Sequence, residues 1–330
     1  MQRAASLFLP GLLLATACGQ HSLAGNTHPD AVAPADTPST EDEVAGPVYR
    51  ESTLHFVEIS ASGADACGIT TDASIECWGS VGECRDQEGE CSAAHGCRVK
   101  PISGTWKHVS VDFGNGCAID TADELACWGC PIGLPTAIDG TFSVVHIPYA
   151  IRLNDGSLAA LGIPTQPQGS PPPPDSPFIS VSGFQYYCGL LLDRSLACWG
   201  TYRNDGIAVQ PPPSGPFLQV AVTNGFGCAI QLDGEVVCWG STTDWDSGNS
   251  RFLPFPGGTY TQIDAGGAYS ACGVRSDGTL ACWGMVAEYP PPPEGQYLQV
   301  AVGGSFFCAL RTDGIAVCWG ENTYGESSPP

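Results

Sequence analysis

Short stretches of alternating hydrophobic and polar residues recur along the chain, and most of them end in the dipeptide Trp-Gly. In one of them, CAIQLDGEVVCWG (Cys228 to Gly240), the turn signal Asp-Gly lies midway between two cysteines. Alternation on both sides of such a turn predicts two antiparallel strands joined by a three-residue loop. The same arrangement begins at five other cysteines: Cys67, Cys117, Cys188, Cys272 and Cys308. The pattern therefore predicts a chain of repeated β-hairpins.

The third residue of a three-residue hairpin loop adopts the left-handed conformation, which favours glycine. Glycine occupies this position in four repeats, at Gly156, Gly234, Gly278 and Gly314. The other three repeats have Ala73, Asp123 and Arg194 there. We expect those three turns to be strained or differently built, because residues with a Cβ atom disfavour positive φ.

The two cysteines of each hairpin are predicted to form a disulfide. Counting outward from the turn places Cys228 opposite Cys238 at a non-hydrogen-bonded pair, where a Cα separation of about 4.5 Å suits a disulfide. In a seventh copy, AIRLNDGSLAALG, Ala150 and Ala160 stand at the cysteine positions. Loss of both cysteines together is expected of a bonded pair, because one orphaned thiol would be reactive. The predicted bridges are Cys67–Cys77, Cys117–Cys127, Cys188–Cys198, Cys228–Cys238, Cys272–Cys282 and Cys308–Cys318.

A further apolar stretch precedes each hairpin, as in FLQVAV at Phe217 and YLQVAV at Tyr297. Its aromatic and β-branched residues predict a third strand in every repeat. Strands that are apolar on both faces must pack between neighbouring sheets. Seven repeats with a period of about forty residues predict an all-β fold, a seven-bladed β-propeller of short, mostly three-stranded, disulfide-stapled repeats.

The charge of the chain limits its partners. The formal net charge is −22, with 12 Lys and Arg against 34 Asp and Glu in 330 residues. Only two lysines occur, Lys100 and Lys107, and no basic cluster is present, so nucleic acid is excluded as a partner on electrostatic grounds. An acidic surface favours solubility or a basic partner.

The N-terminus resembles a bacterial lipoprotein signal. An apolar run, LFLPGLLLATA, follows MQR and is too short to span a bilayer. We expect residues 1–17 to be a signal peptide, Cys18 to be lipidated, and residues 18–49 to be an acidic, Pro-rich, disordered tether before the propeller at 50–330. An ordinary secretory signal cut near Ala17 is the alternative. Either signal exports the chain to an oxidising compartment of the cell envelope, consistent with its 17 cysteines.

Four cysteines remain outside the repeats and Cys18: Cys84, Cys91, Cys97 and Cys130. An even remainder predicts two more disulfides with three possible connectivities. Three of these cysteines lie in an insertion at 80–101. We expect one disulfide to join this insertion to Cys130. Zinc held by the insertion's cysteines and His95 is the alternative.

Other patterns have ordinary structural explanations. The Trp-Gly tryptophans could form a sugar-binding ring, but their periodic placement favours packing between blades. Cys127 and Cys130 have the spacing of a redox motif without its βαβ context. The segment DWDSGN at Asp244 lacks the ligand pattern of a calcium loop. We expect no cofactor and no metal.

The repeated pattern of aromatic-x-x-Val-x-Val followed by Cys-Ala-Leu-x-x-Asp-Gly-x-x-x-Cys-Trp-Gly resembles repeats of the regulator of chromosome condensation family over residues 54–330. The short repeats are most similar to secreted bacterial members, including the propeller-type β-lactamase inhibitory protein. This resemblance implies a seven-bladed propeller that works by binding proteins. Tyr186, Phe226 and Phe306 replace a histidine of the family pattern. Export and disulfides argue against the nuclear exchange-factor activity of the founding member.

The sequence shows no convergent catalytic set, because its six histidines are scattered and no nucleophile or phosphate-binding motif occurs. Non-repeating aromatic residues follow the Trp-Gly dipeptides: Tyr202, Trp245, Tyr289 and Tyr324. They are candidate anchors for a partner, or they cover the edges of loops. We interpret the chain as a lipid-anchored, extracytoplasmic, monomeric propeller that recognises an unknown protein partner. A propeller hydrolase or lyase acting at the channel mouth is the alternative.

Overall fold

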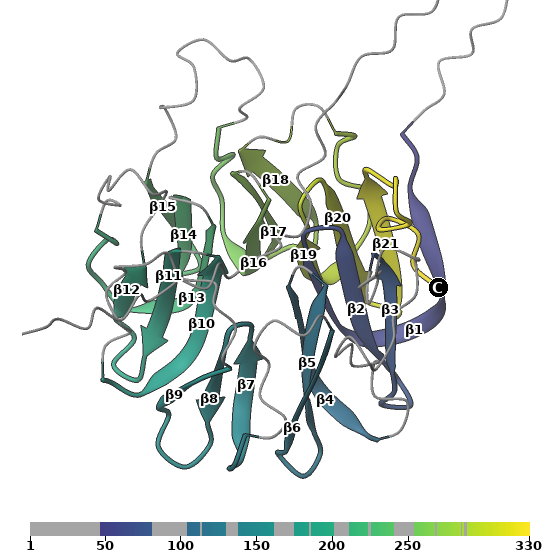
Figure 1. Ribbon diagram of the computed structural model, residues 1–330. Coiled ribbons are helices and arrows are strands. Elements are labelled where there is room, and N and C mark those ends of the chain that lie inside the picture. The colour runs from purple at the N-terminus through teal and green to yellow at the C-terminus, as the bar shows by residue number, and fades with distance from the viewer. Residues whose placement is uncertain are drawn as a thin grey trace, which may run out of the picture. The chain divides into compact units, whose positions relative to one another are not determined.

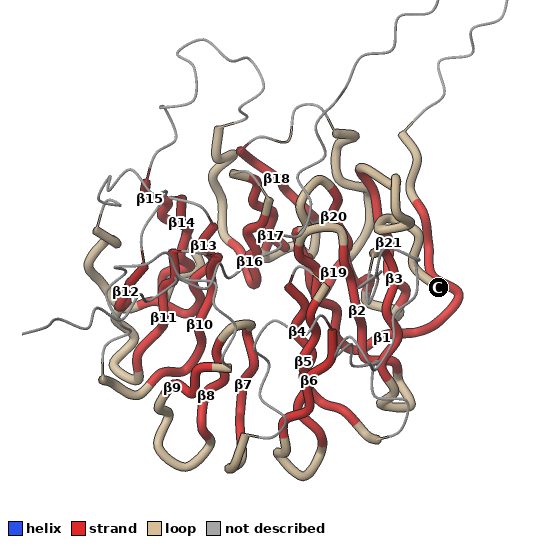
Figure 2. The backbone as a smooth tube through the Cα atoms, viewed as in Figure 1, coloured by secondary structure: helices blue, strands red, loops and turns tan. Residues whose placement is uncertain are grey.

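The computed structural model describes residues 47–80, 104–112, 114–129, 138–161, 175–184, 186–200, 211–223, 226–240, 254–267, 269–284, 286 and 289–330. Figure 2 shows that these residues form strands and loops without a helix. No helix long and apolar enough to cross a membrane occurs in them. The remaining segments, including residues 18–46 of the predicted tether and the insertion at 80–101 beyond Ser80, lie outside the described residues.

Twenty-one strands follow one another in groups of three, and each group is one repeat of the sequence. They are β1 (Arg50–Ser62), β2 (Asp65–Thr70), β3 (Ile75–Gly79), β4 (Trp106–Asp112), β5 (Asn115–Asp120), β6 (Leu125–Gly129), β7 (Phe142–His146), β8 (Tyr149–Arg152), β9 (Leu158–Ala160), β10 (Phe178–Phe184), β11 (Tyr186–Leu191), β12 (Leu196–Gly200), β13 (Phe217–Thr223), β14 (Phe226–Gln231), β15 (Val236–Gly240), β16 (Tyr260–Gly266), β17 (Ser270–Arg275), β18 (Leu280–Gly284), β19 (Tyr297–Val302), β20 (Phe306–Arg311) and β21 (Ile315–Gly320).

Within each group the three strands pair antiparallel in chain order, and the groups are the blades of a propeller. Blade one is β1–β3 and blade seven is β19–β21. Figure 1 shows the blades around a common centre. The central channel is lined by the first strand of each blade, and in blade one by the second half of β1. Hydrophobic clusters join consecutive blades, as where Ile230 of β14 packs with Ile263 of β16. The predicted seven-bladed, all-β propeller is confirmed.

Strand β1 closes the ring, because it belongs to two blades. Its first half pairs with β21, with Arg50 opposite Cys318 and His55 opposite Ile315. Its second half, from Phe56, pairs with β2. The sheet therefore runs β19-β20-β21-β1-β2-β3 without interruption. The C-terminus adds to this seam, since the Thr53 amide donates to the Pro330 carbonyl at 2.8 Å.

One backbone hydrogen bond repeats at every junction between blades. The carbonyl of the last turn residue in each hairpin accepts from the amide of the aromatic residue that begins the next blade. The pairs are Trp106 with Ala73, Phe142 with Asp123, Phe178 with Gly156, Phe217 with Arg194, Tyr260 with Gly234, Tyr297 with Gly278, and Phe56 with Gly314. Their N···O distances are 2.7–2.9 Å. The last pair joins blade seven to blade one, so these bonds form a closed belt.

The three hairpin turns without glycine share the conformation of the others. The φ angles of Ala73, Asp123 and Arg194 are 64°, 69° and 71°, against 86° for Gly234. Of the two expected outcomes, the strain of a positive φ angle is present at all three residues, whereas a different construction of the turn is not. Their carbonyls take part in the belt, and this requirement holds the residues in the left-handed region despite its cost for residues with a Cβ atom.

All six predicted repeat disulfides are present, with Cα separations of 4.0–4.1 Å, and the first cysteine of each pair is buried. The assignment of Ala150 to a cysteine position in the seventh copy is wrong. Tyr149 is the residue opposite Ala160, and Ala150 lies opposite Ala159. The physical reason is a longer loop, closed by the Arg152 amide donating to the Ser157 carbonyl at 2.9 Å.

Tyr149 takes the place of the missing disulfide with an aromatic contact. Its ring meets Tyr187 edge-on at 5.2 Å and Trp199 at 5.6 Å between centroids. Its hydroxyl accepts a hydrogen bond of 3.1 Å from the Trp199 indole. Blade three is thus tied to blade four by packing where the other blades carry a covalent bond within the hairpin.

The Trp-Gly dipeptide ends the third strand of a blade. All six tryptophans are buried, which confirms the packing role over a sugar-binding ring. The glycine after the tryptophan is required for two reasons: its φ angle is positive, and no space is left beside it for a side chain. Gly284 has φ 89°, and a Cβ atom there would lie 2.0 Å from the Tyr269 carbonyl oxygen. Only glycine fits such a close approach between chain segments.

Candidate functional site

The innermost strands of all seven blades surround a central channel of about 600 Å³. Each of these strands exposes one backbone edge to the channel, because its other edge pairs with the second strand of the blade. Unpaired edges must find other hydrogen-bond partners. The side chains that supply these partners come from the neighbouring blades.

A β-bulge at the start of every innermost strand sets the direction of these side chains. The register shifts between the aromatic residue and the residue two positions later, as between Phe217 and Gln219. The same shift occurs in the other six blades. A bulge re-aims the side chains beside it. Here the residue after the bulge reaches the next blade, and the bulged residue itself is left outside the ladder.

Three glutamines after the bulge each bind the backbone of the next blade twice. Gln219 accepts from the Ile263 amide at 3.0 Å and donates to its carbonyl at 2.9 Å. Gln262 does the same with Val300, at 2.8 and 3.0 Å, and Gln299 with Ile59, at 3.0 and 2.8 Å. A carboxamide has one acceptor and donors on adjacent atoms, so it satisfies both groups of a strand edge.

A second set of contacts is made two residues further along the innermost strand, mostly in other blades. Hydroxyl groups of Ser60, Ser110 and Ser182 accept from amides of the next blade at 3.0–3.2 Å. His146 and Asp264 occupy the equivalent position in blades three and six. The Gly183 amide donates to His146 Nε2 at 3.1 Å, and the Val302 amide donates to Asp264 Oδ2 at 2.8 Å.

Enclosure by protein atoms shifts the pKa of both ionisable groups in this set. It raises the pKa of Asp264 to about 7, because loss of solvent disfavours the carboxylate, although two amides partly offset this effect. It lowers the pKa of His146, so that the neutral ring accepts the Gly183 amide. Titration of Asp264 near neutral pH is therefore coupled to a contact between blades six and seven.

Blades one and two carry further ionisable groups at the channel. The Glu58 carboxylate, which accepts a hydrogen bond from the His108 ring, raises the pKa of His108, and the two side chains are 3.2 Å apart. Burial raises the pKa of Asp112 to about 6, although the Ser62 hydroxyl donates to it at 2.7 Å. Burial also raises the pKa of nearby Asp65. No group of three or more His, Cys, Asp and Glu that could hold a metal occurs in the described part of the chain.

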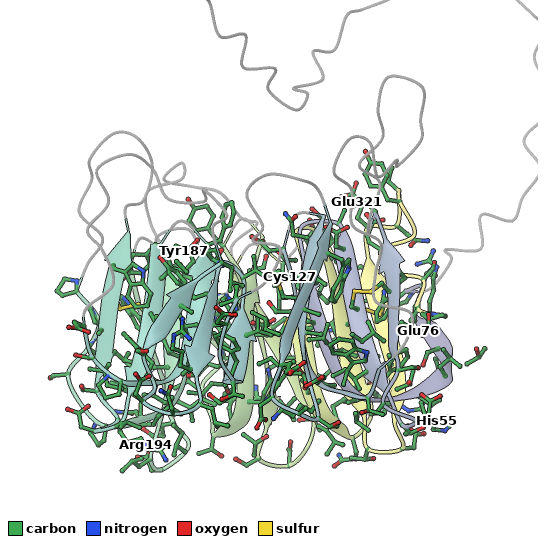
Figure 3. The ribbon with its side chains drawn as sticks, turned by 60° about the horizontal axis from the view of Figure 1, so that its bottom comes forward. His55, Glu76, Cys127, Tyr187, Arg194 and Glu321 are labelled. Carbon is green, nitrogen blue, oxygen red and sulfur yellow. A yellow bond between two sulfur atoms is a disulfide. The ribbon has the colours of Figure 1, made fainter. Side chains whose placement is uncertain are left out.

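The two ends of the ring differ. Figure 3 shows Arg194 of a hairpin turn and His55 at one end, and Glu321, which follows a Trp-Gly dipeptide, at the other. We call the first the hairpin end and the second the Trp-Gly end. The hairpin end repeats one three-residue turn in every blade except blade three, whose turn is one residue longer. In the sequence, a segment of varying length follows each Trp-Gly dipeptide.

The candidate anchors at the Trp-Gly end have different environments. Tyr324 is 63% exposed, and its amide donates to the Glu326 carboxylate at 2.6 Å. Tyr289 is partly buried and meets Phe307 edge-on at 5.4 Å, so it belongs to the packing of blade seven. Tyr202 and Trp245 lie outside the described residues. So do Cys18, Cys84, Cys91, Cys97 and Cys130, together with the Asp244 segment.

Two features of the molecule were not predicted from the sequence. The first is the set of side-chain hydrogen bonds between innermost strands. The glutamine that recurs in FLQVAV, YTQIDA and YLQVAV could have indicated these bonds. The second feature is a set of exposed aliphatic residues at the hairpin end, among them Leu192 and Leu232. Their positions in the turns could be read from the repeats, but their exposure depends on the packing of adjacent blades.

Comparison with known proteins agrees with the repeat pattern. Residues 298–326 match the family model for the Regulator of chromosome condensation (RCC1) repeat. The other six blades repeat the bulge of this segment, and all of them except blade three repeat its three-residue turn, so the repeats of this chain are similar to RCC1 repeats. No curated protein matches the chain. The specific likeness to the propeller-type β-lactamase inhibitory protein stays a prediction.

Two solved propellers show the same fold. The CRINKLY WD40 ectodomain of the Arabidopsis thaliana receptor kinase ACR4 has a TM-score of 0.60 and 19% identity, covering 86% of this chain and 99% of that chain. The ectodomain of the Physcomitrella patens receptor kinase CR4 has a TM-score of 0.58 and 20% identity, covering 83% of this chain and 74% of that chain. Likeness at these identities shows the fold alone.

The pKa of Asp264 predicts a pH-dependent stability difference for Asp264→Asn. The folded protein holds the Asp264 proton more tightly than the unfolded chain does, so the contribution of this residue to stability falls as pH rises from about 4 to about 7. Asparagine keeps an acceptor for the Val302 amide and does not ionise. The variant should match wild type near pH 4 and exceed it by about 1–3 kcal/mol at pH 8, in urea unfolding.

Asp313→Asn is a control of opposite sign. Arg311 lowers the pKa of Asp313 to about 2, so this carboxylate stabilises the fold above about pH 4 and loses that effect as pH falls through about 2. The Asp313→Asn variant should be less stable than wild type at neutral pH. An identical pH profile for Asp264→Asn and wild type would contradict the assignment of Asp264.

Proposed function

We propose that this protein is an exported, lipid-anchored propeller that recognises a protein partner through its Trp-Gly end and has no catalytic role. The belt, the disulfides and the side-chain contacts between innermost strands make the ring a rigid support. Variable segments on a rigid repeat scaffold are the usual location of binding residues.

The contrast between the two ends of the ring is the observation that carries this proposal. The hairpin end has one turn geometry in every blade except blade three, whose loop is one residue longer, and all seven turns are fixed by the belt. The segments that lead from a Trp-Gly dipeptide to the next blade range in length from 12 residues (130–141 and 285–296) to 26 residues (80–105), and the fold does not require the aromatic residues within them. Exposed tyrosine and tryptophan are frequent anchors in protein interfaces. Tyr324 has such exposure, whereas Tyr289 contributes to packing and is left out of the proposed anchor set.

The disulfides support export. The first cysteine of each repeat pair is fully buried, and the bonds can form only in an oxidising compartment. Two similar propellers are ectodomains of receptor kinases. Combined with the lipoprotein-like N-terminus, these features lead us to place the protein at the bacterial cell envelope, held by an acyl chain on Cys18. The specificity of its partner would then be limited to proteins of that compartment.

Replacing Cys18 tests the anchor. The Cys18→Ala variant should move from the membrane fraction to the soluble exported fraction, because it lacks the residue that accepts the lipid. Fractionation and mass spectrometry of the N-terminal peptide measure this. A Cys97→Ala variant controls for the loss of a cysteine elsewhere in the chain. Membrane retention of Cys18→Ala, or a soluble wild type, would refute the anchor without touching the proposal of protein recognition.

Replacing the loop aromatics tests the recognition end. A partner is first isolated by crosslinking to the wild-type protein in envelope extracts and is then purified. The combined Tyr202→Ala, Trp245→Ala and Tyr324→Ala variant should bind it at least about tenfold more weakly, since losing an interface anchor commonly costs 2 kcal/mol or more. Calorimetry gives the Kd, and an unchanged melting temperature shows that the ring is intact.

Leu298→Ser, at the hairpin end, serves as the control for this variant and should leave the affinity unchanged. Equal affinities of the aromatic variant and wild type would remove the Trp-Gly end from the interface.

A further inference from the structure

We propose a second docking surface, at the hairpin end of blades three to five, for a protein partner that presents basic and apolar side chains together. This surface lies on the end of the ring opposite the variable segments and is independent of them. It consists of four exposed leucines and the carboxylates of three hairpin turns.

Large exposed hydrophobic side chains concentrate at the hairpin end. Among the described residues, the leucines of blades three to five are exposed by 50% (Leu153), 63% (Leu192), 45% (Leu218) and 58% (Leu232). Contiguous exposed apolar side chains on a soluble protein commonly mark an interaction site. These four leucines come from three consecutive blades.

The belt brings these residues side by side. The Phe217 amide donates to the Arg194 carbonyl at 2.8 Å, which places Leu218 directly beside the turn that carries Leu192. The Phe178 amide binds the Gly156 carbonyl in the same way, so the turn of Leu153 adjoins blade four. Leu232 begins the turn of blade five. The surface is therefore one stretch of neighbouring segments.

The fold itself exposes the leucines. Leu218 is the bulged residue of β13, and the register shift between Phe217 and Gln219 leaves its side chain outside the ladder. Leu192 and Leu232 are the first residues of their turns. Equivalent turn positions in blades one, two, six and seven hold Thr71, Thr121, Ser276 and Thr312. The repeat therefore does not require an apolar residue there, and blades three to five have one nonetheless.

Fixed carboxylates accompany the leucines. Asp193 Oδ1 accepts from the Ser195 amide at 2.9 Å and its hydroxyl at 2.6 Å, and Asp155 binds Ser157 at 2.9 and 2.7 Å. These bonds lower the pKa of both carboxyl groups, so they are ionised at neutral pH. Asp233 is held by the Glu235 amide at 3.0 Å. Arg194 is the exposed basic residue of these three turns.

The charge of this surface indicates which kind of partner it binds. Apolar side chains between rigid carboxylates complement a surface that carries Lys or Arg beside apolar groups. A second copy of this chain would bring the same carboxylates against each other, at a net charge of −22 per molecule. An anionic lipid surface would be repelled for the same reason. A basic protein is the occupant that fits.

Two synthetic helical peptides test the proposal on the full-length protein. One is built of Lys and Leu with an apolar face, and the other has the same lysines with Gln in place of Leu. Wild type should bind the Lys/Leu peptide at least about tenfold more tightly by calorimetry. Hydrogen exchange should show protection of residues 152–157, 191–195 and 231–235. Equal affinity for the two peptides would overturn the proposal.

Variants with matched controls locate the surface. Leu192→Ser, Leu218→Ser and Leu232→Ser combined should reduce binding of the Lys/Leu peptide to the level of the Lys/Gln peptide. Val57→Ser with Leu298→Ser should change it by less than about twofold, because Val57 and Leu298 are equally exposed bulged residues on other blades. Equal losses in both variants would overturn the assignment to blades three to five.

Two further outcomes would identify a different occupant and contradict the proposal. They are leucine-dependent dimerisation in analytical ultracentrifugation and leucine-dependent binding to phosphatidylglycerol vesicles. The Tyr202→Ala, Trp245→Ala and Tyr324→Ala variant should bind the Lys/Leu peptide like wild type. If the Trp-Gly end is not an interface, binding of the Lys/Leu peptide is therefore unaffected. The two proposals are tested separately.

Discussion

The hydrogen bond between a turn carbonyl and the aromatic amide of the next blade is the contact on which the ring depends. It occurs seven times, and the pair of Phe56 and Gly314 closes the circle. It explains why Ala73, Asp123 and Arg194 accept positive φ angles, because their carbonyls point to the next blade only in that conformation. It also explains the bulge after each aromatic residue, since the strand must leave the belt before it enters its own sheet.

The channel follows from the same arrangement. The belt holds the innermost strands side by side at their starts, and one backbone edge of each strand faces the axis. The side chains after the bulge form hydrogen bonds with the amides and carbonyls of those edges. Gln219, Gln262 and Gln299 do so as neutral groups, whereas Asp264 does so as an acid whose pKa is raised to about 7. The ionisable groups of the channel are thus engaged in holding blades together. This accounts for the channel without assigning a reaction to it, and it leaves the two ends of the ring as the surfaces available for partners.

The sequence predicted the features that follow from regular spacing, but not the belt, the bulges or the contacts between innermost strands. Hairpins, disulfides and third strands follow from spacing, and the number of blades follows from their count. Closure could not be predicted, because Arg50 to His55 matches no repeat and is fixed only by pairing with β21. One extra loop residue in blade three moved Tyr149 into the position expected for Ala150. Of the candidate anchors, Tyr289 and Tyr324 both follow a Trp-Gly dipeptide, and the packing of Tyr289 against Phe307 distinguishes it from the exposed Tyr324. The exposure of Leu218 depends on the bulge, which leaves its side chain outside the ladder.

Native-state hydrogen exchange at the seven aromatic amides tests most directly whether the belt is closed. These amides belong to Phe56, Trp106, Phe142, Phe178, Phe217, Tyr260 and Tyr297. A closed belt predicts that all seven exchange with one free energy, that of global unfolding, because no junction can open alone. Rapid exchange at Phe56 with protection at the other six would show that the ring opens between blades seven and one, and would contradict this account.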